Sequence, residues 1–272
     1  FDEDTDMSDM GYQMNNNWLF AGGQNGLKFT DFDESSVLLS SEYEYGGGYE
    51  ANADLNKSAT YVHLTYKSTF KNTSFMEFGN FHRSASKDYW TTRGNIDAPY
   101  IKKPENYGTM LQYKGPSKDF FNYFLEVKRE KGTQWGFSAL GFATTYTANV
   151  DISPKDNLKF SLMHQHSEEA SWLNWVQDNL LAIYKEKKQR TTVASLNWFG
   201  GDKHELRMKA QMVAFTARNP TAYLGDAYGG LNPVEMTLPP FTLSDLAFQI
   251  RYRYEILPLA YLYVVYSKGG RI

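Results

Sequence analysis

The segment Leu246–Ile256, which reads LAFQIRYRYEI, decides the fold class because two kinds of side chain alternate along it. One set is apolar or aromatic: Leu246, Phe248, Ile250, Tyr252, Tyr254 and Ile256. The other set is small, polar or charged: Ala247, Gln249, Arg251, Arg253 and Glu255. Successive side chains of a β-strand point to opposite faces, so the segment predicts a strand with one apolar and one charged face.

The same period-two pattern recurs along the chain. It is present in Val62–Lys67, Phe121–Lys128, Leu158–Leu162 and Glu205–Ala214, with Phe124 as an exception. The predicted strands reach about ten residues or more, the length of a tilted strand that crosses a membrane. Strands of soluble sheets are shorter, with a mode of roughly five or six residues. The strand length therefore favours a membrane barrel over a soluble sheet.

About twelve strands are predicted, and the links between them alternate between short and long. The strands are expected near 15–29, 36–46, 58–71, 74–85, 107–114, 119–131, 134–150, 156–166, 180–199, 204–217, 244–256 and 259–268. The short links are 30–35, 71–74, 115–118, 153–155, 200–203 and 257–258, and the long links are 47–57, 86–106, 167–179 and 218–243. Only the link at Gly132 departs from the alternation, and we expect a protruding hairpin there. Outer-membrane barrels have short periplasmic turns and long external loops.

We therefore predict one all-β domain over 1–272, an antiparallel up-and-down transmembrane β-barrel in the outer membrane of a Gram-negative bacterium. Aromatic residues make up 16% of the chain and the mean hydropathy is −0.55, as an aromatic-girdled barrel with a polar lumen requires. The formal charge of −3 gives no basic stripe for nucleic acid, and the lack of cysteine excludes disulfides and thiolate metal sites. A soluble secreted β-protein is the rival fold.

The ends of the chain suggest a fragment. Phe1–Asp4 is acidic and does not resemble a signal peptide, so we expect that the natural N-terminus lies upstream or has been removed. The alternation of links makes both ends of the chain point to the external side. Bacterial barrels have an even number of strands, and an open edge would be unsatisfied in lipid. We therefore expect further strands before Asp2 and after Ile272, and fourteen or more strands in the intact barrel.

Four stretches resemble one family. They are Asp9–Trp18, Thr92–Asn95 with Pro99 and Pro104, His204–Gln211, and Ile250–Pro258 with Leu262–Tyr266. They are similar to the outer-membrane barrel domain of unknown function that usually follows a carbohydrate-binding-family-9-like domain in Bacteroidetes and marine Gammaproteobacteria. The resemblance implies a barrel that works with an upstream sugar-binding-like domain. That domain and a closing strand are not present in this chain, and the family has no assigned catalytic residues.

Charged residues on the non-apolar faces of the predicted strands are the first candidate site. They are Lys67, Glu126, Lys128, Glu205, Arg207, Lys209, Arg251, Arg253 and Glu255. Side chains of mixed charge either line a selective aqueous pore or pair across neighbouring strands to fill a narrow barrel. The sequence favours neither interpretation over the other.

The long predicted loops are the second candidate. Residues 86–106 hold Tyr89, Trp90, Arg93 and Tyr100, and 218–243 is rich in proline and glycine. Such loops bind a glycan or a partner protein, fold inward as a plug, or cover the mouth passively. These alternatives stay open at the level of sequence.

Metal and catalytic sites are the weaker candidates. Asp4, Asp6 and Asp9 offer oxygen ligands but lack the Gly and distal Glu of an EF-hand, so a solvated acidic loop is favoured. His164 and His166 share a strand face with Glu168, where a polar cluster at the membrane interface is the simpler interpretation. Ser161 or Ser167 beside the histidines suggests a hydrolase, but no nucleophile-elbow motif is present.

The sequence thus predicts a surface-facing outer-membrane protein without chemistry or cofactors of its own. The first hypothesis is a pore for small solutes or for export of a polypeptide. The second is a plugged barrel that serves as a binding or anchoring platform, and the third is an outer-membrane hydrolase. The expected partners are outer-membrane lipid and lipopolysaccharide, and for the platform an envelope protein or a glycan, with no nucleic acid.

Overall fold

The computed structural model describes residues 19–51, 57–89, 91–92, 95–132 and 140–271. Within these ranges the protein is built of β-strands, turns and irregular segments. No helix of the described part is long and apolar enough to cross a membrane. The predicted all-β, antiparallel, up-and-down fold is confirmed.

Twelve long strands pair in sequence order to form one antiparallel sheet, here called the main sheet. They are β1 (Leu19–Phe29), β2 (Leu38–Ala51), β3 (Lys57–Phe70), β4 (Phe75–Arg83), β7 (Asn106–Lys114), β8 (Phe121–Lys131), β9 (Phe142–Lys155), β10 (Leu158–Glu169), β12 (Leu180–Gly200), β13 (His204–Gly225), β15 (Phe241–Leu257) and β16 (Ala260–Arg271). Four short strands lie in the long connections: β5 (Ser86–Asp88), β6 (Ile101–Lys103), β11 (Trp172–Gln177) and β14 (Leu231–Val234).

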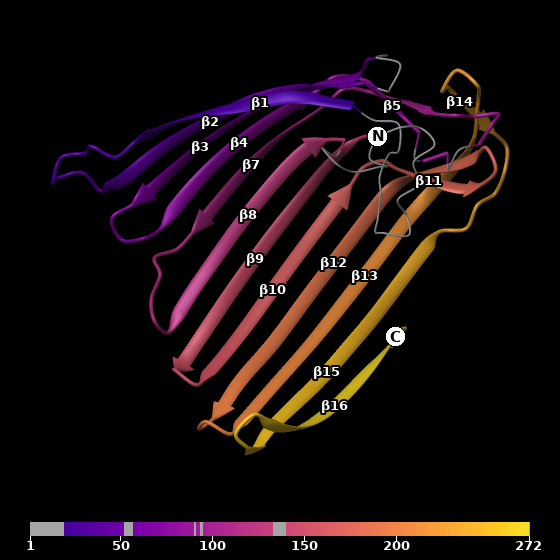
Figure 1. Cartoon of the computed structure of the whole chain (residues 1–272). Helices are drawn as coiled ribbons and strands as arrows, with labels where there is room; N and C mark the ends of the chain where they lie inside the picture. Colours follow the sequence, from indigo (N-terminus) through magenta and orange to yellow (C-terminus); the bar gives the residue numbers. More distant parts are fainter. Residues whose placement is uncertain (1–18, 52–56, 90, 93–94, 133–139, 272) are drawn as a thin grey trace.

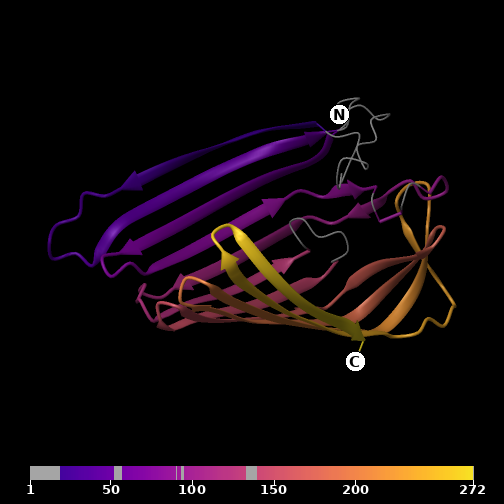
Figure 2. The ribbon, with the colours of Figure 1, turned by 60° about the horizontal axis from the view of Figure 1, so that its bottom comes forward.

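The main sheet is curled, and its two ends differ (Figures 1 and 2). The short strands β5, β11 and β14 gather at one end, which we call the loop end, and the tight turns lie at the opposite turn end (Figure 1). Among the described residues, the sheet runs from β1 to β16, and these strands pair only with β2 and β15. The connections that contain β5, β11 and β14 therefore lie on the loop end, as the alternation of links predicts.

The register aligns residues of one kind across neighbouring strands. Met208 lies opposite Ile250, and the next pair along is Arg207 opposite Arg251. One row crosses eight strands and is polar throughout: Lys28, Glu42, Lys67, Glu77, Gln112, Glu126, Thr147 and Gln165. The adjacent row over the first seven of these strands is apolar or aromatic: Leu27, Tyr43, Tyr66, Phe78, Leu111, Val127 and Tyr146. The sheet therefore has one polar and one apolar face.

Burial identifies the polar face as the concave one. Glu50, Glu130 and Glu205 carry charge and are nevertheless buried, whereas Leu64 and Leu162 on the apolar face are about half exposed. Side chains converge on the concave side of a curled sheet and spread apart on the convex side. We call the polar face the inner face and the apolar face the outer face.

The apolar core lies at the loop end rather than inside the main sheet. β12 and β13 continue beyond the strands beside them, and β11 and β14 add to their free sides to form a four-stranded extension. Ile101, Leu173 and Leu181 are fully buried and form one cluster. A second cluster joins Ala182, Tyr184 and Ala217. These clusters are packed as in a soluble protein, unlike the two faces of the main sheet.

Several predicted boundaries were wrong. The strand expected at 36–46 continues to Ala51, so most of the long link expected at 47–57 belongs to β2, and the strand expected at 204–217 continues to Gly225. The turn expected at 153–155 lies at residues 156–157, because β9 continues to Lys155. The strand expected from 134 begins at Phe142, after Leu140 and Gly141, and residues 133–139 lie outside the described ranges. The short strands β5, β6, β11 and β14 were not predicted, since each falls inside a long link.

Leu259 offers a test of the tight turn between β15 and β16. Its φ is 66°, it follows Pro258, and its side chain is 88% exposed. Proline followed by a positive φ is the pattern of a type II turn, in which the second position favours glycine. We predict that Leu259→Gly raises the free energy of unfolding by about 1 kcal/mol, because the side chain strains the backbone and packs against little. Urea unfolding would measure this, and Leu259→Val should lower stability; equal stability of both variants would contradict the prediction.

Candidate functional site

The structure places all nine predicted lumen-facing residues on the inner face. Lys67 and Glu126 lie in the polar row described above, and Lys128 follows Glu126 on the same side of β8. Glu205, Arg207 and Lys209 alternate with apolar residues along β13, as do Arg251, Arg253 and Glu255 along β15. The period-two pattern therefore predicted their common face correctly.

Glu205 is the centre of the charge cluster on β13 and β15. It is 5% exposed, and its two carboxylate oxygens are held by Arg207 and by Arg253, the latter with Nε 2.9 Å from Oε2. The neighbouring strand β16 contributes aromatic rings to the same face. The guanidinium of Arg251 lies 5.2 Å from the ring centre of Tyr263, and that of Arg253 lies 5.0 Å from that of Tyr261. Such contacts fix the direction in which the arginines point.

The charges on β8 are held by polar contacts within the strand and with β7 and β9 instead. The carboxylate of Glu126 accepts hydrogen bonds from Gln112 Nε2 at 2.7 Å and Thr147 Oγ1 at 3.3 Å. Lys128 Nζ lies 2.9 Å from the Glu130 carboxylate. Glu126 is thus satisfied by donors on both neighbouring strands, whereas the Lys128–Glu130 pair lies within β8; both contacts match the structural interpretation of the inner charges.

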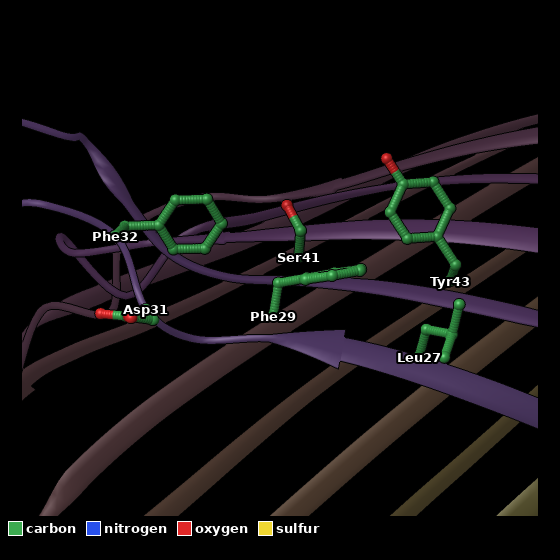
Figure 3. Close-up of a pocket in the computed structure, with 6 residues that line it drawn as sticks. All are labelled: Leu27, Phe29, Asp31, Phe32, Ser41 and Tyr43. Atoms are coloured by element: carbon green, nitrogen blue, oxygen red, sulfur yellow. The ribbon is translucent and has the colours of Figure 1, made fainter.

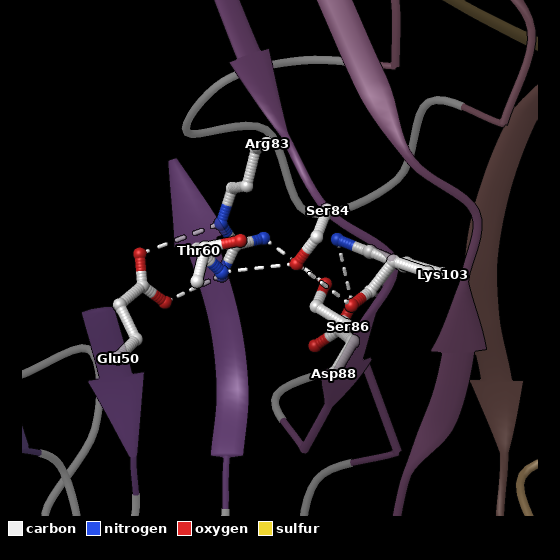
Figure 4. Close-up of polar contacts among 8 residues, drawn as sticks. Glu50, Thr60, Arg83, Ser84, Ser86, Asp88 and Lys103 are labelled. Atoms are coloured by element: carbon white, nitrogen blue, oxygen red, sulfur yellow. Dashed lines mark hydrogen bonds and ion pairs between the residues drawn. The ribbon is translucent and has the colours of Figure 1, made fainter. Parts of the chain in front are cut away.

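Residues 86–106, which we call the crossing loop, begin at an anchor on the inner face that consists of two ion pairs and a hydrogen bond to Ser86 (Figure 4). Arg83 at the end of β4 bridges Glu50 of β2, with Nη2 2.6 Å from Oε2, and donates to Ser86 Oγ at 3.0 Å. Within the loop, Lys103 Nζ lies 2.8 Å from Asp88 Oδ2. Burial lowers the pKa of Lys103, while the Asp88 carboxylate opposes that shift. Charges removed from water in this way are costly unless paired. The first pair joins β4 to β2 where the loop begins, and the second joins the two ends of the loop to each other.

The far end of the crossing loop contacts the four-stranded extension. Ile101 is fully buried against Leu173 and Leu181, and the Lys102 amide donates to the Gly229 carbonyl at 3.0 Å. Since β7, β8, β9 and β10 lie between β4 and β12, the loop passes five strand spacings, about 24 Å along the sheet. Figure 2 shows the crossing loop reaching the orange segments around β14. The loop therefore bridges separate parts of the loop end.

An aromatic cluster lies where the extension joins the main sheet. The Trp172 ring centre is 5.3 Å from that of Tyr184 and 5.2 Å from that of Phe215. Lys187 lies over both Trp172 and Phe215 and is 2.5 Å from the Glu169 carboxylate. Sequence reasoning missed this cluster, although the unbroken apolar run at the start of β12 signals burial on both faces.

The predicted loop-binding residues are only partly described. Tyr89 is 45% exposed, and its ring centre lies 5.5 Å from that of Tyr100, over which Lys87 is stacked at 4.6 Å. Trp90 and Arg93 lie outside the described residues. The crossing loop thus presents a small aromatic surface beside its anchor.

The weaker candidates do not assemble into a site in the described chain. His164 and His166 are on the outer face, where their ring nitrogens contact Thr192 at 2.9 Å and Glu168 at 3.2 Å. Ser161 and Ser167 are on the inner face, so the sheet separates them from the histidines. No group of three His, Asp or Glu side chains suited to a metal ion occurs within the described ranges, and Asp4, Asp6 and Asp9 fall outside them.

A shallow pocket lies on the outer face of β1 and β2, near the turn end (Figure 3). It is lined by Leu27, Phe29, Asp31, Phe32, Ser41 and Tyr43. Asp31 is its single charged residue, and the pocket opens away from the inner charges. Neither the protein-family models nor the curated proteins compared with the sequence gave a match, so the family resemblance stays a prediction.

Ile101 tests how the crossing loop is held. We predict that Ile101→Ala speeds hydrogen exchange of the Lys102 amide, because the cavity weakens a contact of about 2–5 kcal/mol. Hydrogen–deuterium exchange with mass spectrometry would measure the change over residues 95–106. Ile96 is in the same loop and 91% exposed, so Ile96→Ala is the matched control and should leave exchange unchanged. Equal exchange in both variants would show that Ile101 does not hold the loop.

Proposed function

We propose that this chain forms the wall of an outer-membrane β-barrel that conducts small polar solutes, with the crossing loop narrowing its external mouth. The observation that carries the proposal is the opposite character of the two faces, seen in the adjacent polar and apolar rows across β1–β9 and again on β13 and β15. Apolar side chains lie exposed on the outside, and charged side chains line the inside. A wall that meets lipid on one side and water on the other requires this arrangement.

The exposed outer face supports a membrane location. Its large apolar side chains include Leu64, Phe78, Leu111, Leu162 and Leu246, each between 40% and 50% exposed. A contiguous apolar surface of this kind is rare on soluble monomers. In a bilayer the same side chains meet hydrocarbon, and each strand is long enough to span it.

Aromatic residues on the outer face support the same location. Near the turn end, Tyr43 and Tyr66 lie 4.7 Å apart between ring centres, and Tyr113 and Tyr123 lie 5.9 Å apart. Towards the loop end, Tyr107 of β7 and Phe142 of β9 also meet on this face, with their ring centres 6.2 Å apart. Tyrosine is enriched at membrane–water interfaces because its ring is apolar and its hydroxyl stays hydrated. Two bands of rings therefore suit the two interfaces of one bilayer.

The inner face supports conduction over a filled barrel. Arg207, Lys209 and Arg251 are exposed on it, and the two buried apolar clusters of the described residues lie at the loop end. Charged side chains that stay exposed need water beside them, since an unpaired charge in a dry interior is too costly. An aqueous lumen fits these side chains better than a packed one.

The aromatic surface of the crossing loop favours a second function, binding of a glycan or an envelope protein at the mouth. Tyr89 is exposed beside Tyr100 and Lys87, and the anchor holds this group in place. Aromatic rings on a fixed loop suit a sugar face or an apolar partner side chain. Binding at the mouth is compatible with conduction through the lumen.

The channel is tested by the current through planar lipid bilayers that contain the purified protein. We expect discrete conductance steps from the wild type. Ile101→Ala should give larger steps, because a loosened crossing loop obstructs the mouth less, and Ile96→Ala should match the wild type. Folded protein that inserts into the bilayer without any current would contradict conduction and leave the binding platform as the better proposal.

The membrane location is tested by placing one charge on each face of β10. Leu162→Lys on the outer face should lower the free energy of unfolding in lipid vesicles by about 2–4 kcal/mol, because the ammonium would enter hydrocarbon. Gln165→Lys on the inner face is the matched control and should cost far less, since Gln165 neighbours Thr147 on the polar side. Equal costs in urea unfolding would argue against lipid on the outer face.

A further inference from the structure

The inner face of β13 and β15 carries a concentration of positive charge, which we call the basic patch: Arg207, Lys209, Arg251 and Arg253. Arg207 and Arg251 lie directly opposite each other in the register. Like charges directly opposite on one sheet face destabilise the pairing. The main sheet therefore places two cations where a neutral or acidic partner would be more stable.

The carboxylates near the basic patch leave part of its charge uncompensated. Glu205 is occupied by Arg207 and Arg253. In the described part of the chain, Arg251 and Lys209 form no ion pair, and Glu255 lies beyond Arg253 towards the turn end. Their neighbours across β12 and β16 are neutral, since Ser195 is opposite Lys209 and Val265 is opposite Arg251. Two of the four cations thus share the Glu205 carboxylate, and the other two have no carboxylate partner among the described residues.

The aromatic residues of β16 direct the arginines. Tyr263 stacks on Arg251 and Tyr261 on Arg253, so each guanidinium lies over a ring and keeps its N–H edge free of that ring. A guanidinium in this position presents two parallel donors to an oxyanion. Lys209 lies two residues after Arg207 on the same face of β13, opposite Gln249, and adds a further positive charge.

We propose that the basic patch is a binding subsite for solutes that carry a carboxylate or phosphate group, and that it makes the lumen prefer anions. This inference rests on the proposed channel and adds the class of solute. The polar row on β2–β8 mixes Glu42, Glu77 and Glu126 with Lys67, whereas the basic patch gathers four cations around Glu205, so the excess of positive charge lies on β13 and β15. An anion in the lumen is drawn towards the exposed Arg251 and Lys209.

Equilibrium binding of inorganic phosphate to the detergent-solubilised protein tests the subsite directly. We expect saturable binding by the wild type that weakens as salt is raised. Arg251→Gln and Lys209→Gln should each weaken it by up to about fivefold, the effect of one unit charge at contact distance in water. Lys118→Gln removes an exposed charge from the turn between β7 and β8 and should have no effect. Equal binding by all four proteins, or no binding, overturns the proposal.

Ion selectivity in bilayers separates this inference from the channel itself. In a gradient of potassium chloride, the reversal potential of the wild type should show preference for chloride. Arg251→Gln should reduce that preference and Arg251→Glu should reverse it, whereas Lys118→Gln should keep it. Current without anion preference overturns the inference and leaves the channel standing. Phosphate binding without current supports the subsite and contradicts the channel.

Discussion

The structure depends on the fixed pairing of backbone amides and carbonyls between neighbouring antiparallel strands. Because the side-chain period is two, a slip of one residue would move a whole strand's charges to the opposite face. The register keeps Arg207 opposite Arg251 and Met208 opposite Ile250, and equivalent pairs continue from strand to strand. A single constraint on backbone pairing thus sorts all side chains into two environments.

This constraint explains why the sequence predicted the long strands and the nine inner residues well. Each strand carries its own alternating signal, and the pattern needs no knowledge of distant contacts. The crossing loop was beyond such reasoning, because Ile101 gains its burial from Leu173 and Leu181, more than seventy residues away. The sequence offers only a weak local sign of this core, the apolar run Leu180–Ile183. Contacts between residues far apart in the sequence leave no periodic pattern in it.

The inner face combines two kinds of electrostatic arrangement. On β7–β9, Glu126 is satisfied by neutral donors from both adjacent strands. On β13 and β15, Glu205 draws in two arginines and leaves other cations without a carboxylate. Sequence reasoning left pore lining and structural pairing as equal alternatives, and each interpretation suits a different part of the same face. The two arrangements differ because the register places different residue types beside Glu126 and beside Glu205.

In the proposed barrel, the four-stranded extension of β12 and β13 lies in water and the long strands lie in lipid. Ile101, Leu173 and Leu181 pack through the hydrophobic effect, whereas strands in hydrocarbon depend on complete backbone hydrogen bonding. Cooling weakens the first force, since burial of apolar surface is driven by entropy near room temperature. In the proposed barrel, cooling therefore weakens the packing of the extension but not the backbone pairing of the long strands, and the length of β12 and β13 joins the two environments in one continuous ribbon.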